Sequence, residues 1–84
     1  MIRMSVPAFN PRSGPPGYLY VRVADHIQAR VEAGELAPGS RLPSERDLAA
    51  GYGTAVGTVR QAIAELRSRG VVVTLPAKGT YVTS

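Results

Sequence analysis

Residues 42–66, LPSERDLAAGYGTAVGTVRQAIAEL, decide the fold of this 84-residue chain. They contain Ser44 and, three residues later, Asp47, a capping-box pattern in which the serine hydroxyl accepts a hydrogen bond from a backbone N–H of the first helical turn. Gly51 and Gly53 then indicate where this short helix ends. The stretch therefore begins with a predicted capped helix and a glycine-containing turn.

A second helix is predicted directly after this turn, over residues 55–69, and Gly70 is expected to end it. Its apolar residues recur at helical spacing and form one stripe that we expect to be buried: Val59, Ala62, Ile63 and Leu66. Two short helices joined by a tight glycine turn are typical of a helix-turn-helix. In that arrangement the second helix projects from a compact body and can enter the major groove of DNA.

A further helix is predicted upstream, over residues 18–33, with Gly34 at its end. Its apolar residues recur at helical spacing: Val23, Ala24, Ile27 and Val31. Its polar stripe consists of Arg22, His26 and Arg30. Because the sequence has no second histidine and no cysteine, we predict that His26 is a solvated surface residue and that this helix is a packing element.

The C-terminal residues predict a β-hairpin. Residues 71–75 are rich in β-branched side chains, residues 76–79 form a turn, and residues 80–83 return. A two-stranded ribbon is only marginally stable alone, so we expect it to pack on the helices. Arg41 and Leu42 are expected to add a very short strand.

These motifs, in this order, resemble the GntR-type winged helix-turn-helix of bacterial transcription regulators. The resemblance covers nearly everything from Tyr20 to Val82 and rests on four segments: Ala33–Arg41, Leu42–Ala49, Thr58–Ile63 with Leu66, and Gly79–Val82. It implies a mainly α fold with a small β-hairpin, namely a three-helix winged helix-turn-helix. It also implies sequence-specific binding of double-stranded DNA and regulation of bacterial transcription, by repression.

The resemblance also sets an expectation about domain organisation. Relatives carry a second, larger domain after the wing that binds a metabolite and dimerises, whereas this chain ends at Ser84. We therefore expect a DNA-binding domain over residues 18–84 with no effector domain, either standing alone or served by a partner domain on another chain. Residues 1–17, rich in proline and glycine, are predicted to be a flexible arm. This arm either contacts DNA through Arg3 and Arg12 or is a leader with no role.

The sequence departs from the family pattern at the start of the recognition helix. Ser-Arg or Thr-Arg is usual there, and this chain has Ala55 and Val56. The change removes a familiar arginine contact with DNA and the expected serine N-cap, so the family's base specificity does not carry over. Thr54 is the nearest residue that can cap instead. Val56 either contacts a thymine methyl or turns inward beside Val59.

Candidate DNA contacts lie on the two helices of the helix-turn-helix. Backbone N–H groups at the start of a helix bind phosphate readily. In the helix that Ser44 caps, Arg46 lies beside these groups and is the predicted phosphate contact. The alternative is that Arg46 is a charge partner of Glu45 or Asp47. On the recognition helix, Arg60 is expected to contact guanine or phosphate, and Gln61 adenine.

The predicted wing adds a third group of contacts. Lys78 and the backbone at Gly79 are expected at a flanking phosphate or in the minor groove, and the alternative for Lys78 is a solubilising turn residue. Gly57 has no side chain and Ala64 only a methyl, so the recognition helix can lie close to the groove floor. The complete predicted interface is Arg41, Ser44, Glu45, Arg46, Thr54, Ala55, Val56, Gly57, Thr58, Arg60, Gln61, Lys78, Gly79 and Thr80.

Charge and composition narrow the function classes. The net charge of +4 and the pI of about 10.1 favour polyanionic partners. Residues 41–84 hold six basic and three acidic side chains, whereas residues 18–40 hold two basic and three acidic side chains. With no cysteine, one histidine and scattered acids, we expect no disulfide, metal site, cofactor or catalytic residue, and hence no enzyme. With no signal peptide or membrane-spanning stretch, we expect a cytoplasmic protein without a membrane partner.

The expected assembly follows from the short reach of one recognition helix, which reads only a few base pairs. We predict that the free chain is a monomer or weak dimer, and that it pairs as a homodimer on an inverted-repeat operator. The alternative function is a winged-helix protein–protein interaction module that binds DNA only weakly.

Overall fold

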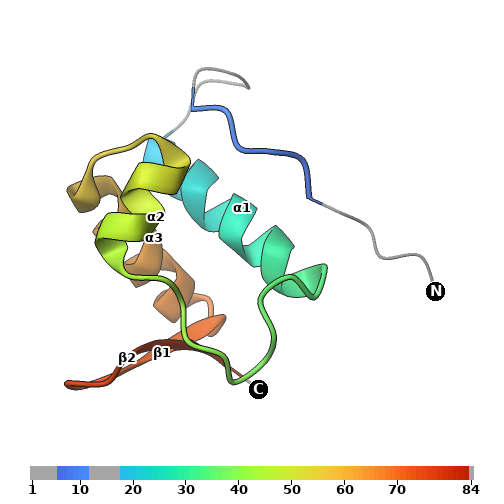
Figure 1. Ribbon diagram of the computed structural model, residues 1–84, viewed down its shortest axis with the longest axis vertical. Coiled ribbons are helices and arrows are strands. Elements are labelled where there is room, and N and C mark those ends of the chain that lie inside the picture. Colours follow the sequence, from blue (N-terminus) through green and yellow to red (C-terminus); the bar gives the residue numbers. More distant parts are fainter. Residues whose placement is uncertain (1–5, 12–17, 84) are drawn as a thin grey trace.

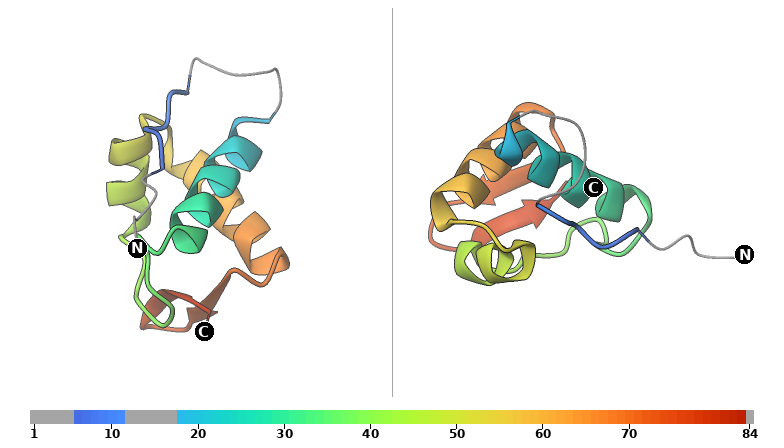
Figure 2. Two further views of the ribbon diagram at one scale, coloured as in Figure 1. Left: turned by 90° about the vertical axis from the view of Figure 1, so that its right-hand side faces the viewer. Right: turned by 90° about the horizontal axis from the view of Figure 1, so that it is seen from above.

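The computed structural model describes residues 6–11 and 18–83. Over these residues, three helices precede an antiparallel hairpin: α1 (Leu19–Glu32), α2 (Glu45–Tyr52), α3 (Val56–Ser68), β1 (Val72–Leu75) and β2 (Gly79–Val82). Both α1 and α2 pack against α3 (Figure 1), and the hairpin closes the end of the helical body opposite the start of α1 (Figure 2). The predicted three-helix winged helix-turn-helix is confirmed.

The hydrophobic core is built around α3. Its buried face consists of the four predicted residues: Val59, Ala62, Ile63 and Leu66. The other helices, the segment before α2 and the hairpin supply the remaining buried apolar residues: Val23, Ala24, Ile27, Leu42, Leu48, Ala49, Tyr52, Val72 and Val82. Because α3 contacts α1, α2 and β1, its orientation determines how the rest of the fold is arranged.

Local interactions determine where α2 begins and where it ends. Ser44 caps the helix as predicted, since its Oγ accepts from the backbone N–H of Asp47 at 3.1 Å. Gly53 ends it with a left-handed φ of 66°, which suits a residue without a Cβ. The prediction that Gly51 helps to end the helix is wrong, because α2 continues to Tyr52 and Gly51 lies inside it.

The predicted capping of α3 by Thr54 is also wrong. The N-cap position falls on Ala55, which has an extended backbone and no side-chain acceptor. The Thr54 hydroxyl instead donates to the carbonyl oxygen of Ala55 at 3.5 Å. Only these two residues separate Gly53 from α3, so Thr54 stands one position too early to cap it. The start of α3 is supported by packing, because Val56 lies against the core.

The hairpin is antiparallel and regular. Its pairs are Val72–Val82, Val73–Tyr81, Thr74–Thr80 and Leu75–Gly79. The first pair is buried, and by the alternation of side chains along a strand the third pair shares its face. The very short strand expected at Arg41 and Leu42 is reduced to a single bridge between Arg41 and Tyr81.

Residues 6–11 lie against the helices. The ring of Phe9 packs edge-on against His26 and Tyr52, with centroid distances of 5.5 Å and 5.1 Å. The guanidinium of Arg22 lies over the same ring, 5.5 Å from its centroid. Aromatic contacts of this kind add about 0.5–1.5 kcal/mol to the burial of apolar surface. This segment is therefore a packed part of the structure.

The sequence predicted a flexible arm for residues 1–17, and the packing of residues 6–11 differs from that expectation. The residue in the sequence that could have indicated this packing is the aromatic Phe9, which the sequence analysis did not single out. Arg3 and Arg12, the predicted DNA contacts of the arm, lie outside the described residues.

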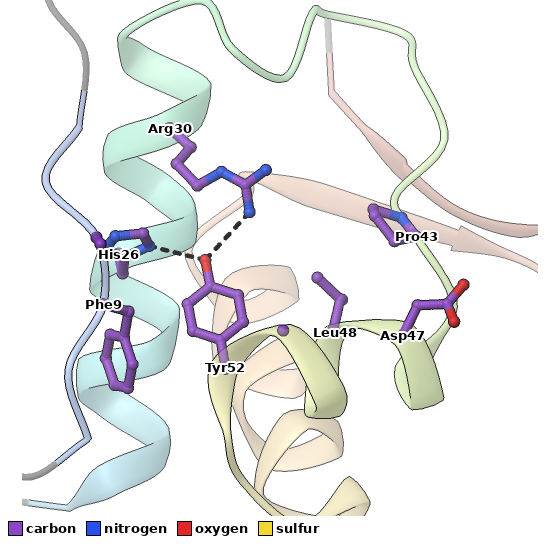
Figure 3. Close-up of a pocket in the computed structure, with 9 residues that line it drawn as sticks. Phe9, His26, Arg30, Pro43, Asp47, Leu48 and Tyr52 are labelled. Atoms are coloured by element: carbon purple, nitrogen blue, oxygen red, sulfur yellow. Dashed lines mark hydrogen bonds between the residues drawn. The ribbon is translucent and has the colours of Figure 1, made fainter.

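The prediction that His26 is a solvated surface residue is wrong. Its Nε2 lies 2.6 Å from the carbonyl oxygen of Pro7 and its Nδ1 lies 2.8 Å from the hydroxyl of Tyr52. A carbonyl only accepts, so in the neutral imidazole Nε2 carries the proton and Nδ1 accepts from Tyr52. The Tyr52 oxygen in turn accepts from Arg30 at 3.3 Å (Figure 3). Burial raises the pKa of the Tyr52 hydroxyl, and Arg30 opposes that shift.

These side chains line a hollow of about 420 Å³ between the N-terminal segment, α1 and α2 (Figure 3). The polar stripe predicted on α1 therefore faces other parts of the chain. It holds the N-terminal segment in place and orients the end of α2.

Replacing Phe9 by alanine is expected to lower the free energy of unfolding by about 1–2 kcal/mol, because the half-buried ring and its aromatic contacts are lost. Urea unfolding of the native chain and the variant measures the change. The exposed neighbour offers a control, since Ala8→Ser should stay within about 0.5 kcal/mol. Equal stability of the native chain and the Phe9 variant would show that the ring of Phe9 contributes nothing to the fold.

Candidate nucleic-acid interface

The start of α3 and the turn of the hairpin project on the same side of the molecule (Figure 1). With its apolar stripe buried, α3 leaves Gly57, Arg60 and Gln61 exposed and Thr58 half-buried. The first turn of α2 and the hairpin turn flank this outer face. We call the surface made of residues 44–46, 57, 58, 60, 61 and 78–80 the interface.

Val56 is a predicted contact whose side chain turns away from this surface. It is half-buried and packs against the core. Of its two predicted orientations, the structure has the inward one, beside Val59. Thr54 is half-buried and Ala55 exposed, directly before α3.

The first turn of α2 presents Arg46 beside the backbone N–H groups of the helix start. Arg46 is exposed, and within the described residues no ion pair joins it to Glu45 or Asp47. The alternative of a charge partner within α2 therefore has no support in this geometry. The hydroxyl of Ser44 is engaged as the cap of the helix.

Glu45 pairs instead with Arg60 of α3, a contact that the sequence reasoning missed. The Arg60 Nε lies 3.0 Å from the Glu45 Oε1, and the two residues are 15 positions apart in the chain. No local signal reveals such a pair, since it depends on how the two helices cross. The ion pair links the two helices of the helix-turn-helix at the centre of the interface.

The hairpin turn carries the predicted wing contacts. Lys78 is exposed at the turn, where its backbone N–H donates to the Leu75 carbonyl at 3.0 Å. Gly79 has a φ of 125°, and a Cβ there would lie 2.6 Å from the Nε of Arg41. The left-handed backbone favours glycine at this position, and a Cβ there would also displace the flexible end of Arg41.

Arg67 ties the hairpin to α3, and the sequence reasoning did not identify it. Its Nη1 donates to the Oγ1 of Thr74 at 2.8 Å, and Thr74 is hydrogen-bonded to Thr80 at 3.0 Å across the strands. The orientation of the wing relative to α3 is therefore held by side-chain hydrogen bonds as well as by the core.

Several predicted residues meet at one hollow between the hairpin and the start of α2. Its volume is about 190 Å³. The lining residues are Arg41, Leu42, Pro43, Ser44, Glu45, Ile63, Gly79 and Thr80. The fold thus brings together predicted contacts from the segment before α2, α2 itself and the wing.

Two groups of basic side chains differ in their partners. On the α1 side, Arg69 bonds Asp25 at 2.7 Å and Glu65 at 2.8 Å, which raises its pKa, and Arg30 pairs with Glu35 at 3.3 Å. The second group lies at or beside the interface: Arg41, Arg46, Arg60 and Lys78. Among the ion pairs of the described residues, Arg60 pairs with Glu45, and no ion pair involves Arg41, Arg46 or Lys78.

In residues 6–11 and 18–83, no three acidic or histidine side chains are grouped so that they could hold a metal ion. No helix in this part of the chain has the length and apolar character needed to cross a membrane.

Comparison with known proteins gives matches over most of the chain. The family model described as bacterial regulatory proteins, gntR family, matches residues 19–82. The mannosyl-D-glycerate transport/metabolism system repressor MngR of Escherichia coli is 39% identical over 64 residues, which cover 76% of this chain. The chain spans 27% of the length of that relative.

Two solved structures share the fold. YtrA from Sulfolobus acidocaldarius, a GntR-family transcription factor, superimposes with a TM-score of 0.77 at 34% identity, covering 95% of this chain and 82% of YtrA. The AraR DNA-binding domain in complex with an operator superimposes with a TM-score of 0.73 at 28% identity, covering 84% of this chain and 90% of that domain.

Gly57→Ala should separate stability from DNA binding. Nothing lies within 4 Å of a Cβ added there, so the variant should be more stable to unfolding by about 0.4–1 kcal/mol. The same methyl would stand between α3 and a groove floor and should weaken binding to a preferred duplex by about 1–3 kcal/mol if base contacts are lost. Thermal unfolding and duplex titration measure the two effects.

Gly51→Ala provides the matched control, because a Cβ at this exposed position of α2 also meets nothing within 4 Å. It should stabilise the fold by a similar amount and leave the affinity for DNA unchanged. Tight DNA binding by the Gly57 variant would contradict a close approach of α3 to the groove.

Proposed function

The chain belongs to the gntR family of bacterial regulatory proteins, and from this premise we propose that it binds double-stranded DNA sequence-specifically and represses transcription in the cytoplasm. The observation that carries the proposal is the exposed Arg60 on the outer face of α3, flanked on one side of the molecule by the first turn of α2 and the hairpin turn. It is supported by the AraR domain, which is seen on an operator, and by MngR, which is a repressor. As a member of a family of regulators, the chain is not an enzyme.

In the proposed complex, α3 lies in the major groove and reads base edges. Arg60 carries the N–H donors that match the O6 and N7 acceptors of guanine, and Gln61 can pair with adenine. Thr58 serves either a base or a phosphate. The absence of a side chain at Gly57 allows the helix to approach the base pairs closely.

The flanking elements hold the protein on the sugar–phosphate backbone. Arg46 and the N–H groups at the start of α2 bind one phosphate, because a helix N-terminus favours negative charge. Lys78 and the backbone at Gly79 bind another beside the groove. Contacts of this kind fix register and orientation and carry no sequence information by themselves.

The alternative function, a protein-interaction module with weak DNA binding, is not favoured. The resemblance to an operator-bound domain and the family's regulators both favour DNA. The large apolar side chains that are exposed within the described residues, Tyr18, Val73 and Leu75, do not lie on the interface.

Selection from a pool of random duplexes, followed by competition against unselected DNA at several salt concentrations, tests the proposal. We expect a preferred sequence that binds about 10³-fold or more tighter than random duplex. Enrichment of no sequence would contradict sequence-specific binding.

Arg46→Ala and Lys78→Ala are each expected to weaken binding to preferred and random duplexes about equally. Each should also reduce the slope of log affinity against log salt by about one, because one phosphate contact is lost. Arg69→Ala removes the same charge at the far end of α3, where Arg69 pairs with Asp25 and Glu65, and should leave the slope unchanged. A slope unaltered by both interface variants would mean that neither side chain contacts the backbone.

We also propose that the chain is a monomer or weak dimer when free and pairs as a two-fold homodimer on an inverted repeat. The exposed large apolar side chains of the described residues are Tyr18, Val73 and Leu75, whereas a stable dimer interface needs roughly 800 Å² per partner. Two copies on symmetric half-sites supply the specificity that one recognition helix lacks.

Sedimentation of the free chain, and then of the chain titrated with an inverted-repeat duplex built from the selected sequence, measures this assembly. We expect a monomer without DNA and two protein chains per duplex. A tight dimer in the absence of DNA, or a single chain bound stably to the full repeat, would refute it.

A further inference from the structure

We propose that Glu45 is a positioning residue for base recognition: it holds the Nε edge of Arg60 so that the two terminal amino groups face the major groove. This inference rests on the proposed function, because it requires α3 to read DNA. It concerns the residue that determines how α3 recognises one base pair.

The geometry of the pair supports this role. The Arg60 side chain is 68% exposed, while the Glu45 side chain is 42% exposed and belongs to the first residue of α2. Glu45 also lines the hollow beside the hairpin, and its backbone belongs to the first turn of α2. The exposed guanidinium is thereby fixed at one edge by the less exposed partner.

The chemistry of the guanidinium gives this contact a direction. Arginine has five N–H donors in a planar fork, and the Nε–H is engaged by Glu45 at 3.0 Å. The Nη1 and Nη2 groups at the far end of the fork then remain for the O6 and N7 acceptors of guanine. A guanidinium that is already oriented loses less conformational freedom when it makes this bidentate contact.

The carboxylate has a second effect. It places a negative charge beside the cation and so makes Arg60 a poorer partner for a phosphate at an arbitrary position on DNA. Like charges at an interface discriminate against wrong partners. Glu45 should therefore favour the preferred sequence over random duplex as well as orient Arg60.

Arg60 is the arginine of α3 that can read a base. Val56 occupies the position where the resemblance leads one to expect an arginine, and it packs on the core. The other arginine of α3, Arg67, donates to Thr74 of the hairpin. Arg60 is thus the arginine of α3 left to read a base, and Glu45 is its partner.

The experiment uses the 84-residue chain and the duplex that it selects, with each G·C pair of the duplex replaced in turn. Arg60→Ala should abolish discrimination at one G·C pair, a change of roughly 5- to 150-fold in relative affinity. Glu45→Ala should lose discrimination at the same pair, and the double variant should lose no more than Arg60→Ala alone.

Two conservative variants separate positioning from charge. Glu45→Gln keeps an oxygen that accepts from Nε–H and should retain most of the discrimination, although it removes the charge. Glu45→Asp keeps the charge but withdraws the carboxylate by one carbon, and it should lose most of the discrimination. Asp47→Asn is the matched control, because it removes one negative charge from the same helical turn and should leave the discrimination intact.

The outcomes distinguish this inference from the proposed function. Selection of no sequence would overturn both. Retained discrimination in Glu45→Ala or in Arg60→Ala, with sequence-specific binding otherwise intact, would overturn the inference alone. Equal loss in Asp47→Asn and Glu45→Gln would show a general charge effect and would also overturn it. Thermal unfolding of each variant confirms that the comparison is made between folded proteins.

Discussion

Burial of one stripe of α3 is the constraint on which the rest of the structure depends. The stripe consists of Val59, Ala62, Ile63 and Leu66. Each large aliphatic side chain of this kind stabilises the fold by about 1.5–3 kcal/mol when fully buried, against a net stability of only about 5–15 kcal/mol for a whole domain. The rotation of α3 about its axis is therefore fixed. Gly57, Arg60 and Gln61 are exposed because the opposite side of the same helix is buried.

The orientation of α3 alone does not make a DNA-binding surface, because α2 and the hairpin also have to lie in the right places beside it. The left-handed Gly53 turns the chain sharply enough for α2 to lie across α3 and present its capped start beside Arg60. The hairpin is attached twice, through the buried valine pair that joins the core and through the hydrogen bonds from Arg67 to the threonines. Both attachments leave the turn of the hairpin on the same side as the start of α3 (Figure 1).

The helices, the buried face of α3 and the hairpin could be predicted because their signals are local. Periods of 3.6 and 2 residues, the Ser44 cap and Gly53 need no knowledge of the rest of the chain. The contacts that were missed join distant residues: His26 with Pro7 and Tyr52, and Arg60 with Glu45. The wrong prediction of Thr54 as N-cap has a different cause. The length of the turn decides at which residue α3 begins, and residue propensities do not predict that length to within one residue.

The eight-residue helix α2 connects the two polar regions of the molecule. At about 1.5 Å per residue it is roughly 12 Å long and behaves as a rigid rod. Its last residue, Tyr52, is held by His26, Arg30 and Phe9. Its first residue, Glu45, holds Arg60. Between these two ends, Leu48 and Ala49 pack α2 into the core against α3. Phe9, in a segment predicted to be a flexible arm, thus packs on the same helix whose first residue contacts Arg60.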